Sequence, residues 1–514
     1  MYRGQKIKKM LVFSIVQLLL TNSFMTIVGS ETTINEKEDI YLEEEIPLDI
    51  SYVYNITENL SNIIFTEYNE SAGEIAKGRA YGTKGEHKAA EILYENFTKL
   101  GLFTYNETIE NTEKYPELTH ELEIEEFFVK FNGEKIESYI APVWFETSEN
   151  NNCLNYTYNY TNLKVIQAKI NPFLYILKEK INGTLEPFII IMKDNSFHPY
   201  ECFENKTIFD NFYFSYFFLR YTQGSNPILY SYLWNNYLDY FKGLILYDYN
   251  KDVYDMNILK YKNKVPFIYI NNSNGNKILN NLDNSKIDFK IRQNLNTSVN
   301  SKNVIAQLNG TDPSKTVLVD CLYDLWWCQG TADSAIGMAM VLAIAKYYVE
   351  NNIRPKYTIK FIGFCGEEHG FCAGSKYYSS IHEDENILYI IDLNQLGFKQ
   401  LNPKLILNIF GNDIALLLKI KHVLKDANYV ERVNSSKDLD YIYLKRKIPS
   451  NPLPFLESHP KSKILCFLKD GNWKLHHRDG MNHQEGDVLK YFDPQDVNVT
   501  GELILKTLRY LTVE

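Results

Sequence analysis

The sequence of 514 residues lacks several features that would place it in a simpler class. No run of Lys and Arg is long enough to bind a nucleic acid, and the formal net charge is −10. Internal repeats and low-complexity tails are absent, which excludes a repeat array. After the N-terminal segment no apolar run is long enough to span a membrane, so no further transmembrane span is expected. The length favours roughly two to four domains.

Cysteine is scarce and odd in number. The seven cysteines are Cys153, Cys202, Cys321, Cys328, Cys365, Cys372 and Cys466. At least one of them is therefore unpaired within the chain or bonded elsewhere. Cys321 with Cys328, or Cys365 with Cys372, are near enough in sequence to pair locally, although spacing does not determine connectivity. Thiolate ligation of a metal by Cys321 and Cys328 is the alternative, but an exported thiol pair more often becomes a disulfide.

The N-terminus has the order of a secretory signal. Basic residues are followed by an apolar run from Met10 to about Val28 and then by the small residues Gly29 and Ser30. We expect residues 1–30 to be a signal peptide and the protein to be secreted. An uncleaved membrane anchor is the alternative, because the run is nearly long enough to span a bilayer. Asn-x-Ser/Thr sequons agree with export, among them Asn55, Asn69, Asn106, Asn155, Asn205 and Asn434.

The N-terminal part of the expected mature chain contains one clear helix and one clear hairpin. Residues 31–70 are acidic and polar with little periodicity, and we interpret them as a leader arm. The segment 78–101 begins with a Gly-rich turn and continues as an amphipathic helix that Gly101 ends. The text LEIEEFFVKFNGEKI predicts two strands joined at Asn132-Gly133.

Residues 140–300 differ in composition from the rest. They are rich in Tyr, Phe and Asn and poor in long helical patterns. Strands are predicted at 242–252, 265–270 and 286–291, with a short helix after the second. This pattern indicates a separate β-rich domain inserted into a host domain.

From residue 303 onward, strand patterns alternate with helix patterns. Five apolar strands are predicted, at 316–324, 357–366, 387–397, 404–410 and 462–468. The intervening helices include 333–352, for which Asp333 is a suitable N-cap, and 413–427. Short apolar strands that alternate with helices predict an α/β fold with a mostly parallel, mixed sheet covered by helices on both faces.

Polar residues gather where these strands end, which is where open α/β sheets bind ligands. They are Asp324, Asp333, Glu367, Glu368, Asp392 and Asn394, with His483 and Asp487 in a polar loop before the final helix. Singly, each has a structural explanation as a helix cap or as solvated surface. Together, two acids and a histidine at one rim have the composition of a catalytic zinc site, and an adjacent acid is placed to accept a proton.

Over residues 75–145 and 303–514 the chain resembles the aminopeptidase and glutamate carboxypeptidase family with co-catalytic zinc. That family also includes glutaminyl cyclases and non-catalytic relatives such as the transferrin receptor and nicastrin. The segments that carry the resemblance are GRAYGTKGEHKAAEILYENFTKLGL, NVIAQLNGTDPSKTVLV, ADSAIGMAMVLAIA, RPKYTIKFIGFCGEEHGFCAGSKYY and HQEGDVLKYFD. The resemblance implies a zinc-exopeptidase-like domain at 71–139 and 301–514, with a protease-associated-like domain inserted at 140–300.

The resemblance also implies roles for individual residues. Asp333 corresponds to the bridging carboxylate, Glu367 to the general base, and Glu368 and His483 to zinc ligands. The residues expected at a second metal site, or in support of the ligands, are Asp324, Asp392, Asn394 and Asp487. One tightly bound zinc ion is the expected cofactor.

Two ligands of the family's second zinc do not match in this chain. Leu322 stands where the family has the His of His-x-Asp, and Asn394 stands where it has an Asp three residues before Gly397. Leu has no lone pair and Asn offers only a neutral carbonyl oxygen, so a second zinc would be held weakly. Asp320 and Asp392 lie two residues earlier on the same strand faces and would replace the lost ligands after a slip in register.

Three functions stay open from the sequence. The first is an aminopeptidase-like zinc exopeptidase in which a metal-activated water hydrolyses peptide bonds. The second is a transferase with a single zinc that resembles glutaminyl cyclase. The third is a non-catalytic receptor or scaffold that has kept the fold. A peptide substrate is the expected partner, and a homodimer stays open.

Overall fold

The computed structural model describes most of the chain from residue 48 onward. The described residues are 48–63, 78–136, 138–141, 156–167, 178–194, 239–248, 266–326, 329–367, 372–398, 407–426, 451–468 and 487–513. The predicted signal peptide and most of the predicted leader arm lie outside these ranges. Glu368, His483 and the cysteines at 153, 202 and 328 also lie outside them.

One sheet has seven strands in the order β16-β17-β15-β12-β14-β11-β2. These are β2 (Phe103–Thr108), β11 (Lys302–Leu308), β12 (Asp312–Leu322), β14 (Tyr357–Phe364), β15 (Ile387–Asn394), β16 (Asn408–Gly411) and β17 (Lys463–Leu468). The four central strands β17, β15, β12 and β14 run parallel, whereas β11, β2 and β16 pair in the antiparallel sense. The predicted mostly parallel, mixed sheet is therefore confirmed.

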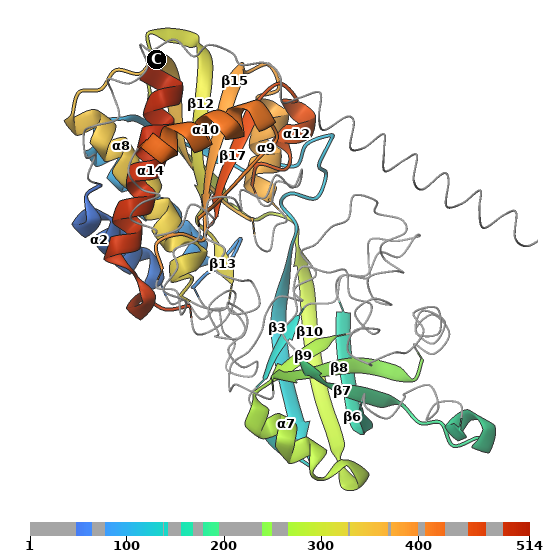
Figure 1. The fold of residues 1–514 in the computed structure, drawn as a ribbon. Coiled ribbons are helices and arrows are strands. Elements are labelled where there is room, and N and C mark those ends of the chain that lie inside the picture. Colours follow the sequence, from blue (N-terminus) through green and yellow to red (C-terminus); the bar gives the residue numbers. More distant parts are fainter. Residues whose placement is uncertain are drawn as a thin grey trace, which may run out of the picture. The chain divides into compact units, whose positions relative to one another are not determined.

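Helices cover both faces of this sheet (Figure 1). One core contains residues of α2 (Ile50–Ser61), α3 (Lys84–Lys99), α8 (Ile336–Glu350), α10 (Ile414–Asp426) and α14 (Pro494–Val513). A smaller core contains residues of α9 (Ala373–Ile381) and α12 (Phe455–Ser458). Successive residues of β12 enter alternate cores, because side chains along a strand point to opposite faces. Both faces are thus buried, which explains why these strands are apolar runs.

The helix α8 begins later than the sequence predicts. Its first residue is Ile336, and Asp333 lies in the preceding turn η5 (Thr331–Ala335) with non-helical backbone angles. The prediction of Asp333 as the N-cap is therefore wrong, since its side chain makes contacts outside the helix. Within the described ranges, Thr331–Glu350 is the one helical stretch long and apolar enough to cross a membrane, and 83% of that apolar window is buried in the protein. Packing in the core accounts for its composition.

The predicted leader arm contains a helix that the sequence analysis did not predict. α2 has Asp49 as its N-cap, and the Asp49 side chain accepts from the backbone N–H of Tyr52. Val53, Ile56 and Leu60 are buried in the same core as α8. The i, i+3, i+4 spacing of these apolar residues is helical, but polar residues surround each of them in the sequence.

A second sheet has eight strands in the order β4-β3-β10-β6-β7-β8-β9-β5. These are β3 (Glu121–Phe131), β4 (Glu134–Ile136), β5 (Ser138–Ala141), β6 (Tyr156–Gln167), β7 (Phe188–Asp194), β8 (Phe241–Asp248), β9 (Phe267–Ile270) and β10 (Lys286–Asn296), with the helix α7 (Asn272–Leu279) after β9. The hairpin at Asn132-Gly133 forms, and both residues have positive φ as its turn requires.

The hairpin strands β3 and β4 join this second sheet through β10. From the sequence, these two strands are predicted in the host domain. A hairpin signal shows which two strands pair, but it does not show which sheet they join. The assignment of 140–300 as an inserted protease-associated-like domain stays a prediction. A separate short pair joins β1 (Gly78–Arg79) to β13 (Leu325–Trp326).

Candidate metal centre

Asp333 lies in the turn η5, between β13 and α8. Its side chain is buried, with 1% of the residue exposed. Its carboxylate oxygen Oδ2 accepts a hydrogen bond from Nε2 of Gln395 at 3.2 Å. The predicted zinc ligand is therefore contacted at its carboxylate by a residue that directly follows β15.

The backbone of this turn is held by Asp487, which is fully buried. Oδ1 of Asp487 accepts from the N–H of Ala332 at 2.7 Å, and Oδ2 accepts from the N–H of Asp333 at 3.0 Å. Burial raises the pKa of Asp487 to about 7, although the two backbone donors and the charge of Arg79 act in the opposite direction. Asp487 thus supports Asp333 through the backbone.

A buried arginine holds the loop that leads into this turn. The guanidinium of Arg79 donates to four carbonyl oxygens, those of Tyr323 (2.8 Å), Leu60 (2.9 Å), Gln329 (2.7 Å) and Gly330 (3.1 Å). Gly330 has a φ of 58°, and a Cβ at this position would lie 2.9 Å from Nη2 of Arg79. Glycine is needed here for both reasons. One side chain therefore connects α2, the end of β12 and the loop before η5.

Glu367 and Asp324 meet at the ends of neighbouring strands. Asp324 follows β12 and is fully buried, and Glu367 follows β14. The backbone N–H of Glu367 donates to Oδ1 of Asp324 at 3.0 Å. A carboxylate at the end of the central strand therefore positions the backbone of the predicted general base.

The loop that carries Glu367 is closed at its base. The N–H of Gly374 donates to the carbonyl of Cys365 at 2.9 Å. Asn303 bridges the same two residues, because its Oδ1 accepts from the N–H of Cys365 at 3.4 Å and its Nδ2 donates to the carbonyl of Gly374 at 2.9 Å. The close approach leaves no room for a side chain at Gly374, where a Cβ would lie 2.2 Å from Oδ1 of Asn303.

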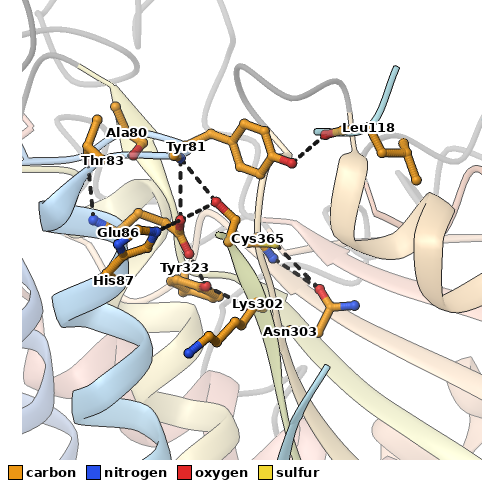
Figure 2. Close-up of polar contacts among 12 residues, drawn as sticks. Ala80, Tyr81, Thr83, Glu86, His87, Leu118, Lys302, Asn303, Tyr323 and Cys365 are labelled. Carbon is orange, nitrogen blue, oxygen red and sulfur yellow. Dashed lines mark hydrogen bonds and ion pairs between the residues drawn. The ribbon is translucent and has the colours of Figure 1, made fainter. Parts of the chain in front are cut away.

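Behind this loop a buried carboxylate connects α3 to the end of β12 (Figure 2). Glu86 accepts from the hydroxyl of Ser301 at 2.5 Å, from the N–H of Gly82 at 3.3 Å and from the hydroxyl of Tyr323. Figure 2 shows the carboxyl of Glu86 pointing toward the ring hydroxyl of Tyr323. Burial raises the pKa of Glu86, although these donors stabilise its charged form. Since Tyr323 immediately precedes Asp324, the network fixes the residue that holds Glu367.

The positions of the second metal site are occupied differently. Leu322 and Asn394 are both buried. Two residues deeper, Asp320 on β12 lies opposite Asp392 on β15, which lies opposite Cys466 on β17. The thiol of Cys466 donates to Oδ2 of Asp392 at 2.9 Å. The two acids that would replace the lost ligands after a slip in register are thus in one buried row with this thiol.

The acids in this row resist ionisation. Burial, strengthened by the neighbouring carboxyl of Asp392, raises the pKa of Asp320 well above its usual range. Burial also raises the pKa of Asp392 to about 6, although the thiol of Cys466 donates a hydrogen bond to it. Two carboxyls that face each other in a dry interior share one proton in preference to carrying two charges.

No disulfide forms among the described cysteines, and Cys321, Cys365 and Cys466 carry free thiols. The local pairing of Cys365 with Cys372 that their spacing allows is therefore wrong. The pairing of Cys321 with Cys328 stays untested, because Cys328 lies outside the described residues. Burial raises the pKa of Cys321 well above its usual value, which favours the thiol over a metal-binding thiolate.

The donor set that the resemblance implies is of the kind that binds one zinc ion. Two carboxylates and an imidazole, which Asp333, Glu368 and His483 would supply, leave a fourth position open. Glu368 and His483 lie outside the described residues. Within the part of the chain that the structure describes, no group of three His, Cys, Asp or Glu side chains is arranged to hold a metal. The second site does not fit, because Leu322 and Asn394 provide no anionic ligand.

Three supporting residues were not predicted from the sequence. Arg79, Asn303 and Gln395 each act across more than 60 residues of sequence. Glu86 had a local signal, because Thr83 is the N-cap of α3 and Glu86 follows it at the spacing of a capping box. Its second role, as a partner of Tyr323, depends on the tertiary fold alone.

Comparison with known proteins agrees with this architecture. Residues 303–508 match the family described as Peptidase family M28. A search of curated proteins gave no match. The chain is similar in structure to BSAP, a zinc aminopeptidase from Bacillus subtilis, with a TM-score of 0.59 and 16% identity over 91% of this chain and 96% of that one.

Two further solved structures show the same fold. A Peptidase M28 precursor from Shewanella amazonensis SB2B gives a TM-score of 0.55 at 15% identity, over 89% of this chain and 92% of that one. An aminopeptidase from Aneurinibacillus sp. strain AM-1 gives 0.51 at 16% identity, over 91% and 94%. The zinc-exopeptidase-like α/β fold is therefore confirmed, and residues 303–508 match Peptidase family M28, in agreement with the zinc aminopeptidase-like family that the sequence resemblance implied.

Proposed function

We propose that the chain is a secreted exopeptidase of the aminopeptidase type that uses one zinc ion. Membership of a peptidase family supports the reaction class. The observation that carries the proposal is the contact between Asp324 and the backbone of Glu367, which holds the proposed general base just beyond the end of β14.

Asp333, Glu368 and His483 hold the metal in this proposal. When bound, zinc polarises the scissile carbonyl and lowers the pKa of a water molecule. Glu367 accepts the proton of the attacking water and returns it to the leaving amine. Asp487 keeps the carboxyl of Asp333 in place through the turn backbone, and Asp324 does the same for Glu367.

The test is hydrolysis by the purified secreted chain and its Glu367→Gln variant. Aminoacyl amides of Leu and Glu serve as exopeptidase substrates, and peptides with N-terminal Gln report cyclisation. We expect hydrolysis by the wild type and a loss of roughly 10²- to 10⁴-fold in kcat in the variant, with zinc still bound. Glu91→Gln, at an exposed position of α3, is the matched control and keeps full activity. Equal hydrolysis by Glu367→Gln would remove Glu367 from the mechanism.

A non-catalytic scaffold is the second candidate, and the buried Leu322 and Asn394 favour it. It predicts that the zinc-loaded wild type hydrolyses none of these substrates. A glutaminyl cyclase-like activity predicts turnover of the Gln peptides alone. The same panel of substrates therefore separates the three functions.

Export is part of the proposal. The basic and apolar N-terminal segment supports cleavage near residue 30, and the sequons support glycosylation of the exported chain. N-terminal sequencing of the chain recovered from the medium tests this. A membrane-bound chain that retains Met1 would show that the segment is an anchor.

A further inference from the structure

Gln395 occupies an unusual position next to Asp333. It directly follows β15 and adopts a φ of 50°, in the left-handed region that residues other than Gly seldom enter. Its side chain is half-buried, and Nε2 lies 3.2 Å from Oδ2 of Asp333. A carboxylate can only accept, so the amide group donates this hydrogen bond.

The contact matters because of what a bridging carboxylate needs. A carboxylate that bridges two metal ions places one oxygen on each of them. Leu322 and Asn394 stand at two ligand positions of the second ion and supply no anionic donor. A hydrogen bond to a charged group contributes on the order of 1.5–3 kcal/mol, so the amide of Gln395 stabilises this oxygen of Asp333.

The amide donor Gln395 is adjacent in sequence to a position where a ligand of the second metal is missing. Gln395 follows Asn394, the position of a missing ligand, and its amide reaches the oxygen of Asp333. Asp392, the nearest carboxylate on the same strand, is instead hydrogen-bonded to Cys466. The loss of the second metal and the gain of an amide donor are therefore adjacent in the structure.

We propose that Gln395 takes the place of the second metal ion, as a positioning residue that fixes Asp333 as a ligand to a single zinc. This inference rests on the proposed zinc site of Asp333, Glu368 and His483. The neutral amide orients the carboxylate without neutralising it, so the negative charge that attracts one cation is kept. Residues that orient a metal ligand by hydrogen bonding typically contribute 10- to 100-fold in metal affinity.

The experiment measures zinc affinity by competition with a chromogenic chelator, using the full mature chain. Gln395→Met keeps the length of the side chain and removes the donor, and we expect zinc to bind 10- to 100-fold more weakly. Gln495→Met, the same change at an exposed residue at the start of α14, should leave the affinity unchanged. Thermal melting of the zinc-free variants shows whether each is folded. If Gln395→Met does not fold, Gln395→Asn, whose amide is one methylene shorter, replaces it with the same expectation.

A second measurement adds the missing ligands. The double variant Leu322→His, Asn394→Asp should bind one zinc per chain while Gln395 is present and two when Gln395→Met is added. Unchanged affinity in Gln395→Met, or two zinc ions in the double variant with Gln395 intact, would overturn the role of Gln395. A wild type that binds no zinc would instead contradict the proposed function.

Discussion

Two groups of buried acids lie near the ends of the parallel strands, and their surroundings differ. Asp324, Asp333 and Asp487 each contact an N–H donor of the backbone or of an amide. Asp320 and Asp392 lie two residues deeper and face one another, with the thiol of Cys466 as a donor. The first group holds its carboxylates in fixed directions, whereas burial raises the pKa values of the second group and favours its protonated form.

The two groups correspond to the two halves of the metal site that the proposal distinguishes. The half with Asp333, which is proposed to bind zinc, has supports that come from elsewhere in the fold, such as Arg79, Asn303 and Glu86. At the other half, Leu322 is buried and supplies no ligand. The proposal therefore predicts metal at the first half alone.

Among the substitutions of these acids, the largest effect on stability is expected at Asp320, which faces Asp392. Burial raises the pKa of Asp392 in the folded state to about 6. Its protonation therefore stabilises the folded state fully below pH 3.8, and this stabilisation is lost as the pH rises through 6. The loss amounts to on the order of 3 kcal/mol. Asp320→Asn replaces the proton with an amide donor, so the variant should be more stable than the wild type at pH 7.5 and should depend less on pH. Urea unfolding at pH 5 and pH 7.5 measures both effects.

The control for this variant is Asp312→Asn on the same strand. Asp312 is paired with Ser314 and Lys315, and these contacts lower its pKa. Its substitution should leave the pH dependence of the wild type in place. A decrease in stability for Asp320→Asn at pH 7.5 would show that the deeper pair is stabilised as two charges, by a cation for example.

Asp487→Asn should have a smaller effect on stability than Asp320→Asn, and it should be destabilising. Asp487→Asn retains one acceptor oxygen and places an amide N–H₂ against the second backbone N–H of the turn. One buried donor then lacks an acceptor, which should cost about 1–2 kcal/mol at pH 7.5. Zinc affinity should fall as well, because the turn carries Asp333. Urea unfolding and chelator competition measure the two effects, and a gain in stability would erase the distinction between the two groups of acids.

The regular parts of this fold could be predicted because their signals are local. Helical spacing identified α3, and Gly101 ends it with a φ of 77°. Apolar runs located β12, β14, β15 and β17 within a few residues, and Asn132-Gly133 located the hairpin. Each of these signals lies within about 20 residues of sequence, so it does not depend on the tertiary packing of distant segments.

The site could be predicted only in part, for the same physical reason. The apolar strand patterns predicted that Asp324 and Glu367 follow two strands, and they lie just beyond β12 and β14. Asp333, predicted in the loop that enters a helix, lies in the turn η5. The contacts of Arg79 with Gln329 and Gly330 span about 250 residues and are set by the packing of α2 against the loop. The prediction of an N-cap at Asp333 was wrong because the same residue type suits a cap and a metal site.

The most direct test of the account is the zinc content of the purified mature chain, measured by elemental analysis after equilibration with excess zinc and removal of weakly bound metal. We predict one zinc ion per chain in the wild type and none in His483→Ala. Two zinc ions per chain would mean that the half-site around Leu322 and Asn394 still binds metal. No zinc in the wild type would contradict the single-zinc site on which the proposed peptidase activity depends.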